Sequence, residues 1–430
     1  MEALTNHLPT SLKDSLPING ELYVGNMPLN HIEKLVSHTP FYAYDRQLII
    51  NKVTQLITTL PKEISLHYAI KANPYPSLVQ LMATQVTGFD VASKKEMLLA
   101  LQTGMAAKNI SFAGPGKTMQ DIEAAIIAGV TLHVESIGEI AKVKKIAEQL
   151  HIKADIAIRV NPAFELKSSG MKMSGGAKPF GIDEEQIAQV LMNLPLAQVN
   201  LRGFHIFAGS QNLNANAIIC AQQQTFALAE QLITLTKKVT KLEIEYLNIG
   251  GGFGIPYFSN DNSLDINAIA GNLQTLLQQY KTISSNVEVI LELGRYLVAE
   301  AGVYVCKIVD KKVSRGTTYL VCDGGLHHHL ANSGNFGQVI RKNYPVAIGN
   351  KFITHKSNSI CSNELKVQPA LEQVNIVGPL CTPLDILADK VKLPKANVDD
   401  YVVVFQSGAY GASASPKDFL SQTQLSEILL

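Results

Sequence analysis

Excess charge, long apolar runs and paired cysteines are all scarce in this sequence. It holds 37 Lys and Arg residues against 36 Asp and Glu residues, a net charge of +1. That balance gives no electrostatic basis for binding nucleic acid or a membrane surface. No apolar run approaches the ~20 residues that cross a bilayer. The segment that starts at Met1 lacks a basic stretch followed by an apolar one, so we expect no signal peptide.

The cysteines are few, odd in number and scattered, which favours a reducing compartment over a disulfide framework. A cytoplasmic enzyme is therefore the expectation. Low-complexity segments and short repeats are absent from the sequence, and 430 residues suffice for two sizeable cores. The cysteines are Cys220, Cys306, Cys322, Cys361 and Cys381.

Apolar, β-rich runs alternate with helix-like stretches through the first 300 residues. In the stretch 137–150, isoleucine and valine recur at helical spacing, at Ile137, Ile140, Val143 and Ile146. Eight such runs favour a parallel (β/α)8 TIM barrel over the alternative, an open doubly wound sheet. The predicted strands are 64–70, 86–91, 109–113, 130–135, 154–160, 199–206, 243–249 and 287–293; the predicted helices include 94–104, 118–128, 184–194, 214–237 and 264–281.

After residue 300 the strand-like runs are separated by loops instead of helices, which predicts a mostly antiparallel β domain. The segment Glu21–Val24 would add a strand to it. We therefore predict a barrel over residues 41–298 and a β domain built from 1–40 and 299–430. The strand-like runs are Val303–Val309, Thr317–Cys322, Val374–Leu380 and Tyr401–Gln406.

Polar residues and glycines recur in phase at the carboxyl ends of the predicted barrel strands. In a (β/α)8 barrel these ends form the catalytic face. Eight positions in phase therefore predict a functional site at this face. They are Lys71, Asp90, Gly114, Glu135, Asn161, the loop near His205, Gly250 and Glu292.

Three of these strand ends together offer an amine, an anion cradle and a carboxylate. Lys71 is either a salt-bridge partner or an amine that forms a Schiff base. The run Gly250–Gly254 and the pair Gly294-Arg295 follow strands seven and eight, where barrels often bind phosphate, although a tight turn uses the same glycines. Glu292 either favours a protonated pyridine nitrogen or pairs with Arg295. As a set they predict covalently held pyridoxal phosphate.

The predicted β domain carries its own candidates. Cys381 follows a strand and precedes a polar turn, whereas most lone cysteines are small core residues. Tyr410 also follows a strand, and either reaches a ligand or is a buried tyrosine bonded to backbone. The run His327–His329 looks like a metal cluster, but consecutive side chains of an extended chain point to opposite faces. We therefore predict no metal site.

These residues, as an ordered set over about 40–425, resemble the fold-type III pyridoxal-phosphate decarboxylases, which act on diaminopimelate, ornithine and arginine. Tyr68–Asn73 is similar to the family's Schiff-base lysine motif, and Phe89–Ser93 to its second-strand motif. The resemblance implies that Lys71 and Cys381 are catalytic, with Cys381 as the proton donor. It implies cofactor contacts from Lys71, Asp90, His205, Phe207, Ser210, Gly251, Gly252, Gly254, Glu292, Gly294, Arg295 and Tyr410.

The same resemblance implies a homodimer in which the β domain contributes Cys381 and Asp385 to a partner's barrel. It gives substrate contacts to Thr382 and Asp385. Alanine racemases of this fold place an arginine where Glu292 stands, so Glu292 favours decarboxylation over racemisation. A non-catalytic protein that carries the cofactor is the alternative from another class, and the joint presence of Lys71, Glu292, Cys381 and Asp385 disfavours it.

Departures from the family pattern narrow the resemblance. A diaminopimelate decarboxylase is the alternative function. Such enzymes have Glu-Ser after the cysteine, whereas this sequence has Thr382-Pro383, which disfavours that alternative. The family's ring-stacking histidine aligns with Phe207, so either Phe207 or, with a shifted register, His205 stacks on the cofactor. Residues 323–329, 340–345 and 378–383 resemble the subgroup of the carrier-linked glutamyl decarboxylase and the exosortase-associated decarboxylases. The substrate would then be an amino acid, either free or tethered to an acyl carrier protein. Arg341 and Tyr344 would be further substrate contacts. Arg341 would bind a substrate carboxylate or a carrier phosphate; the alternative is an ordinary surface arginine.

Overall fold

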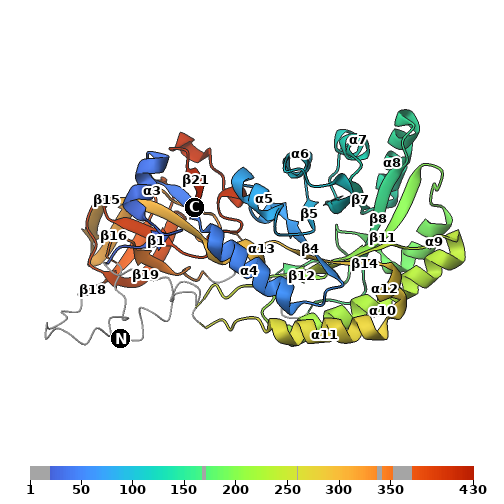
Figure 1. The fold of residues 1–430 in the computed structure, drawn as a ribbon. Coiled ribbons are helices and arrows are strands. Elements are labelled where there is room, and N and C mark those ends of the chain that lie inside the picture. Colours follow the sequence, from blue (N-terminus) through green and yellow to red (C-terminus); the bar gives the residue numbers. More distant parts are fainter. Residues whose placement is uncertain (1–19, 167–170, 259, 337–340, 352–369) are drawn as a thin grey trace. The chain divides into compact units, whose positions relative to one another are not determined.

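The computed structural model describes residues 20–166, 171–258, 260–336, 341–351 and 370–430 (Figure 1). Cys361 and residue 340, both named above, lie outside these ranges. The chain forms two compact units, one of residues 50–255 and 262–297, the other of residues 1–49, 256–261 and 298–430. The domain limits 41 and 298 stay predictions. In the ranges that the structure describes, no helix combines the length and apolar character needed to cross a bilayer.

The first unit is a closed barrel of eight parallel strands, which confirms the predicted fold. Strand β14 pairs with β4, and β7 pairs with β8, so the ring has no open edge. The strands are β4 (Ile64–Ala69), β5 (Gly88–Val91), β6 (Ile110–Phe112), β7 (Thr131–Val134), β8 (Ala154–Asn161), β11 (Val199–Ile206), β13 (Tyr246–Gly251) and β14 (Glu288–Leu293).

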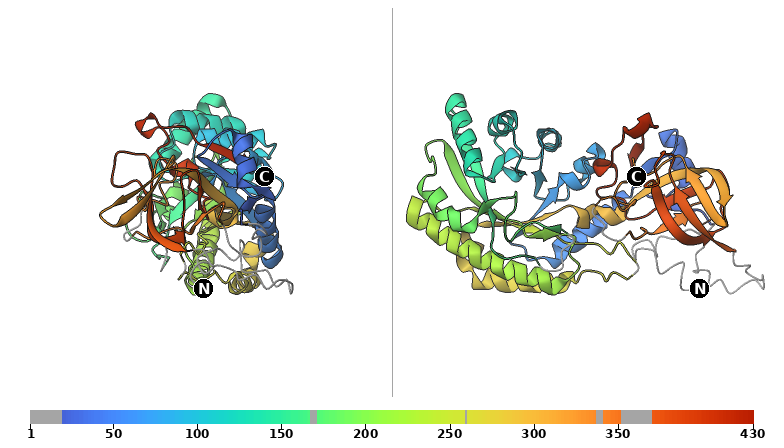
Figure 2. Two further views of the ribbon diagram at one scale, coloured as in Figure 1. Left: turned by 90° about the vertical axis from the view of Figure 1, so that its left-hand side faces the viewer. Right: turned by 180° about the vertical axis from the view of Figure 1, so that it is seen from behind.

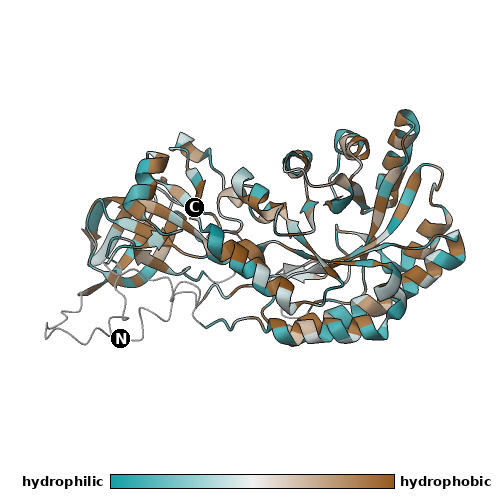
Figure 3. Ribbon diagram, viewed as in Figure 1, coloured by the Kyte–Doolittle hydropathy of each residue, from teal (hydrophilic) through white to brown (hydrophobic). Residues whose placement is uncertain are grey.

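Helices follow the strands and cover the barrel with amphipathic faces. In Figure 3 the strands are largely brown, whereas α10 and α11 alternate brown and teal. These two helices pack side by side (Figure 2). The helices are α4 (Arg46–Thr59), α5 (Pro76–Met82), α6 (Lys94–Gln102), α7 (Met119–Ala128), α8 (Ile137–Leu150), α9 (Ile187–Met192), α10 (Ala215–Thr240), α11 (Ile266–Gln279), α12 (Lys281–Asn286) and α13 (Arg295–Val298).

Helix starts are fixed by side chains that cap the free backbone N–H groups. Ser93, Thr118 and Ser136 stand before α6, α7 and α8, and each side-chain oxygen accepts from the backbone N–H three residues on, at 3.0–3.2 Å. The helix predicted from isoleucine and valine spacing is α8, in which Ile140, Val143 and Ile146 are buried. Ile137, in the first turn, is 57% exposed.

The second unit is a mostly antiparallel sheet around a long bent strand, β15 (Gly302–Ser314). Its first half pairs with β3 (Phe41–Tyr44) and β20 (Tyr401–Val404), and its second half with β16 (Thr317–Cys322). Parallel pairs join β16 to β18 (Leu371–Val377) and β3 to β21 (Ser426–Leu429). Two further strands, β17 (Val346–Ile348) and β19 (Ile386–Pro394), lie at the ends of the strand order.

The predicted strand Glu21–Val24 does not join this sheet. Instead β1 (Tyr23–Val24) pairs with β2 (Met27–Pro28) before helix α3 (Leu29–Val36). The segment is tied to the rest of the unit by Leu22, whose backbone N–H donates to the carbonyl of Gly349 at 2.7 Å. The core beneath includes Leu22, Leu29, Ile32, Phe41, Val305 and Phe405.

Candidate active site

Three adjacent strand ends bring Lys71, Asp90 and Glu292 together inside the barrel mouth. Lys71 lies in the 3-10 turn Ile70–Ala72 that follows β4, between β14 with Glu292 and β5 with Asp90. Its Nζ is 3.2 Å from Glu292 Oε1 and 3.6 Å from Asp90 Oδ2. The lysine side chain is 39% exposed, whereas both carboxyl groups are buried. The amine is therefore accessible, whereas the two carboxyl groups beside it are not.

The two carboxyl groups titrate in opposite directions. Burial raises the pKa of Asp90 well above its usual range, and the neighbouring Glu292 charge raises it further. Burial also acts to raise the pKa of Glu292, but the Lys71 ammonium and a hydrogen bond with Asp90 outweigh it and lower that pKa to about 2. Two close carboxyl groups cannot both ionise easily. We therefore assign one shared proton to Asp90, which leaves Glu292 as the anion.

Glu292 is held from its other side by the end of β13 and by β11. Asn248 Nδ2 donates to Glu292 Oε2 at 3.4 Å, while Asn248 Oδ1 accepts from the Gly250 N–H at 2.8 Å. His205 Nε2 lies 3.6 Å from the same carboxylate oxygen. Burial, together with the Arg159 and Lys71 charges, lowers the pKa of His205, so this ring is neutral at physiological pH. The Glu292 carboxylate is thus hydrogen-bonded by β13 and lies beside the neutral imidazole of β11.

The glycine run after β13 permits close backbone approach. Gly250 and Gly252 have φ values of +65° and +75°, which L side chains rarely adopt. A Cβ on Gly252 would lie 2.1 Å from the carbonyl oxygen of Gly209, and one on Gly294 would lie 2.8 Å from Ala72 Cβ. Ser210 is the residue after Gly209, and the two form the short strand β12 (Gly209–Ser210). The sequence predicted an anion cradle here, and the structure brings these glycines to the end of the barrel that carries Lys71.

Of the two candidates for ring stacking, Phe207 lies beside the amine. Its ring centre is 5.9 Å from Lys71 Nζ, and the ring packs over Gly250. His205 lies deeper, with its ring centre 4.6 Å from that of His133. The choice between them stays a prediction, and this geometry favours Phe207.

The sequence reasoning missed Arg159, a buried cation within strand β8. Its Nη1 donates to Glu135 Oε1 at 3.0 Å, and its guanidinium carbon lies 5.2 Å from the ring centre of Phe180 and 5.9 Å from that of Phe207. Glu135 also accepts from the backbone N–H groups of Gly114 and Gly181, at 2.5 and 3.2 Å. An arginine within the apolar run Ile156–Val160 was the signal that could have identified it.

The candidates of the β unit divide into one exposed and several inward-facing side chains. Cys381 is exposed in the turn after β18, next to Thr382. Asp385 is buried, and Tyr344 packs on Tyr257 with ring centres 4.7 Å apart. Tyr410 has a φ of +54°, and its ring stacks on Phe336 at 6.5 Å.

Arg341, predicted as a contact for a substrate carboxylate or a carrier phosphate, points at backbone. Its Nε and Nη2 donate to the carbonyls of Ser333 and Ile386 at 3.1 and 3.0 Å, and Nη1 to Asn343 Oδ1 at 3.2 Å. Each guanidinium nitrogen is thus engaged inside the unit. Its role toward a ligand stays a prediction.

The assumption of an extended chain at His327–His329 is wrong, because these residues form a turn. The rings of His327 and His328 lie 3.7 Å apart, and His329 Nε2 bonds with Ser407 Oγ at 2.9 Å. Within the described parts of the chain, no group of three or more His, Cys, Asp or Glu side chains is placed to hold a metal ion.

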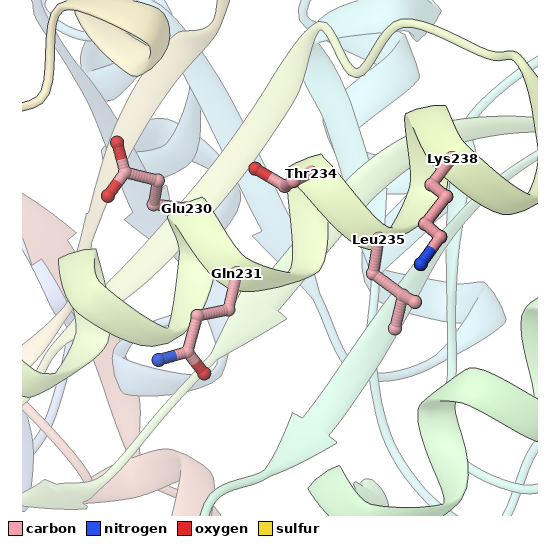
Figure 4. Close-up of a pocket in the computed structure, with 5 residues that line it drawn as sticks. All are labelled: Glu230, Gln231, Thr234, Leu235 and Lys238. Carbon is pink, nitrogen blue, oxygen red and sulfur yellow. The ribbon is translucent and has the colours of Figure 1, made fainter.

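A hollow of about 420 Å³ lies outside all of these groups (Figure 4). Its five lining side chains come from helix α10 alone. They are Glu230, Gln231, Thr234, Leu235 and Lys238. The predicted site residues do not line it, and one helix surface does not enclose a ligand.

An accessible lysine amine beside a buried carboxylate, with a glycine cradle at the mouth of a closed barrel, fits pyridoxal phosphate and defines a barrel enzyme of that cofactor class. Residues 46–299 match the family model described as pyridoxal-dependent decarboxylase, pyridoxal binding domain. The chain belongs to this family. It is a pyridoxal-phosphate-dependent amino-acid decarboxylase, as the sequence predicted.

Named relatives cover nearly the whole chain. The L-glutamyl-[BtrI acyl-carrier protein] decarboxylase of Niallia circulans is 36% identical over 91% of this chain and 88% of its own length. The 2-[(L-alanin-3-ylcarbamoyl)methyl]-2-hydroxybutanedioate decarboxylase of Staphylococcus aureus is 30% identical over 88% and 91%. Among solved structures, diaminopimelate decarboxylase of M. jannaschii in complex with L-lysine is similar with a TM-score of 0.81, at 26% identity over 96% of this chain and 92% of that one.

Proposed function

We propose that this decarboxylase acts on an amino-acid head group whose side chain ends in an acyl linkage, as in an aminoacyl group carried by an acyl carrier protein. The two relatives described above bear names of this kind: one substrate is a glutamyl group on a carrier protein, the other an alanine joined at C3 to a carbamoyl group. A diaminopimelate decarboxylase of Aquifex aeolicus is also 30% identical to this chain, so the test below includes diaminopimelate. Diaminopimelate, in contrast, has a second charged amino-acid centre at its far end. The likeness of these two substrate names is the main support for the proposal.

The turn beside Cys381 agrees with an uncharged far end. Thr382 and Pro383 bring neither a carboxylate nor an ammonium to this turn, and proline also removes a backbone donor. In the part of the chain that the structure describes, Arg341 donates hydrogen bonds to Ser333, Asn343 and Ile386. A carboxylate that grips a distal ammonium contributes roughly 1.5–3 kcal/mol, or about ten- to a hundredfold in affinity. Free diaminopimelate therefore lacks that contribution from Thr382.

The chain's own groups divide the chemistry among them. Pyridoxal phosphate, when bound, withdraws electrons from the α-carbon as CO2 leaves. Lys71 supplies the amine that holds the cofactor, and Glu292, an anion at physiological pH, stabilises positive charge on the ring nitrogen. The backbone of Gly251, Gly252, Gly254 and Gly294, with Arg295, would bind its phosphate. Cys381 gives its Sγ proton to the α-carbon.

We further propose a homodimer in which Cys381 and Tyr410 serve the barrel of the other copy. Support comes from the family resemblance and from the exposure of Cys381. Mixing Lys71→Ala with Cys381→Ala protein should restore part of the activity, because one intact site forms in each mixed dimer. Subunits that exchange and stay inactive would contradict the shared site.

The substrate proposal is tested by comparing kcat/KM for four compounds: a glutamyl group on a carrier protein, free glutamate, an N3-acylated 2,3-diaminopropionate, and meso-diaminopimelate. An acyl-linked substrate should exceed diaminopimelate by at least about tenfold, the lower bound for a lost charged hydrogen bond. A clear preference for diaminopimelate would replace the proposal with the ordinary diaminopimelate decarboxylase.

A further inference from the structure

The turn that carries Cys381 is closed on itself by backbone hydrogen bonds. The Gly378 N–H donates to the Asp385 carbonyl at 3.1 Å, and the Asp385 N–H donates to the Thr382 carbonyl at 3.2 Å. Within the loop, the Thr382 N–H donates to the Leu380 carbonyl at 2.8 Å. Cys381 is therefore carried by a compact turn, Gly378–Asp385, and not by a free segment.

A single buried carboxylate ties this turn to a second one. Asp385 is 2% exposed; its Oδ2 accepts from the Leu380 N–H at 2.8 Å, and its Oδ1 from the Leu326 N–H at 2.6 Å. Leu380 directly precedes Cys381. Leu326 belongs to the turn Gly325–His329, in which the His328 and His329 N–H groups both donate to the Gly325 carbonyl.

Both turns leave room for this carboxylate only because they carry glycine. A Cβ on Gly325 would lie 2.2 Å from Asp385 Oδ1, and one on Gly378 would lie 2.3 Å from Asp385 Oδ2. Neither glycine has a left-handed backbone, so close approach, and not conformation, explains both. Two turns that are far apart in the sequence are thus shaped around one side chain.

Strand β19, which begins directly after Asp385, is hydrogen-bonded by side chains that follow the second turn in the sequence. Arg341 joins the carbonyl of Ile386 to that of Ser333, and Asn332 Nδ2 donates to the carbonyl of Leu387 at 2.9 Å. Asp385 has no cation within ion-pair distance in the part of the chain that the structure describes. Two backbone amides therefore supply the hydrogen bonds that hold the buried carboxylate.

We propose that Asp385 is a positioning residue for Cys381, assisted by Arg341, and not the substrate contact that the family resemblance implied. The carboxylate holds the Leu380 N–H and so fixes the backbone on which the thiol is carried. Each carboxylate oxygen accepts from one backbone amide, and the residue is only 2% exposed, so it offers little surface to a substrate. The proposal rests on the proton-donor role proposed above for Cys381.

The test combines turnover with the chemical reactivity of the thiol in the cofactor-loaded protein. Asp385→Asn keeps the shape but offers one acceptor instead of two, so one buried amide loses its partner. Alkylation of Cys381 by iodoacetamide, followed peptide by peptide with mass spectrometry, should become at least about threefold faster because the turn loosens and a negative charge beneath it is removed. The value of kcat should fall at least about tenfold and KM should stay within about threefold, as expected for a group that does not bind substrate.

Asp399→Asn is the matched control, since Asp399 is exposed and its left-handed backbone (φ +71°) suits asparagine. It should leave thiol reactivity and kcat unchanged. If Asp385→Asn does not fold, Arg341→Gln loosens the same strand from the other side and should shift both readouts in the same direction.

A large rise in KM with kcat and Cys381 reactivity unchanged would overturn the proposal and make Asp385 a substrate contact. Unchanged values of all three would overturn it as well. Full activity of Cys381→Ser would instead refute the proton-donor role, and the alkylation rate would still decide whether Asp385 positions the thiol.

Discussion

The shared proton between Asp90 and Glu292 leads to a prediction about their coupling. The pKa of Glu292 is lowered from its usual 4.5 to about 2. A buried carboxylate held as an anion also stabilises a protonated ring nitrogen, which a neutral amide cannot do, so Glu292→Gln should lower kcat by about a hundredfold.

The stability of the cofactor-free protein should respond differently. In Glu292→Gln, Asp90 loses the negative neighbour that raises its pKa, ionises, and takes over as counter-ion of Lys71 3.6 Å away. Asp90→Asn alone replaces a neutral acid by a neutral amide, and should cost less than about 1 kcal/mol. The double variant leaves Lys71 without either carboxylate. Because the lysine is 39% exposed, we expect an extra loss of only about 1–2 kcal/mol beyond the sum of the single changes.

Scanning calorimetry of the wild type, the two single variants and the double variant measures this coupling. For a domain of this size, each kcal/mol corresponds to about 2–4 °C in Tm. Additive effects within about 0.5 kcal/mol, or an Asp90→Asn variant as unstable as Glu292→Gln, would refute the assignment of the proton to Asp90.

Three further predictions concern other parts of the molecule. Cys381→Ser should keep the cofactor's absorbance but lose most amine formation, and full product release would contradict this. Gly252→Ala should abolish cofactor retention because its Cβ would meet the Gly209 carbonyl, whereas Gly271→Ala, with open space around it in α11, should retain the cofactor and be slightly more stable in thermal unfolding. Burial lowers the pKa of His329 to about 3, so below about pH 6.5 the unfolded chain binds a proton at this residue that the folded state does not. His329 should therefore account for about 2 kcal/mol of the stability lost between pH 7 and 5, and His329→Gln should reduce that loss by about this amount in denaturant titrations at each pH.

Most of the barrel could be predicted from sequence because its strands are continuous apolar runs. The predicted run 154–160, for example, is β8 (Ala154–Asn161), and the predicted helix 137–150 matches α8 in both bounds. Strand β19 was missed because Lys390 and Lys392 face solvent and weaken its apolar pattern. Local periodicity reports burial on one face, and an exposed face of lysines does not display it.

The partners of the site residues were harder to predict than the residues themselves. Lys71 and Glu292 could be paired because barrel closure places strand eight beside strand one. The pairing of Arg159 with Glu135 and the hold of Asp385 on Leu326 depend on side-chain directions and loop packing that no spacing encodes. Asp385 is the clearest case: family resemblance identified it as important, while only its two backbone amides show what it contacts.

Glu135 has a consequence for altering this enzyme by design. Its carboxylate binds the backbone of Gly114 after β6, the backbone of Gly181 beyond β8, and the side chain of Arg159 within β8. Substrate choice in barrel enzymes is usually changed by exchanging one strand-end loop at a time. Here the loops after β6, β7 and β8 share one acceptor, the Glu135 carboxylate. Replacing any one of these loops therefore leaves a hydrogen-bond donor or the acceptor in the other two without its partner. This third of the barrel rim must be exchanged as a block, whereas the segments around Lys71 and Gly252 do not share that acceptor.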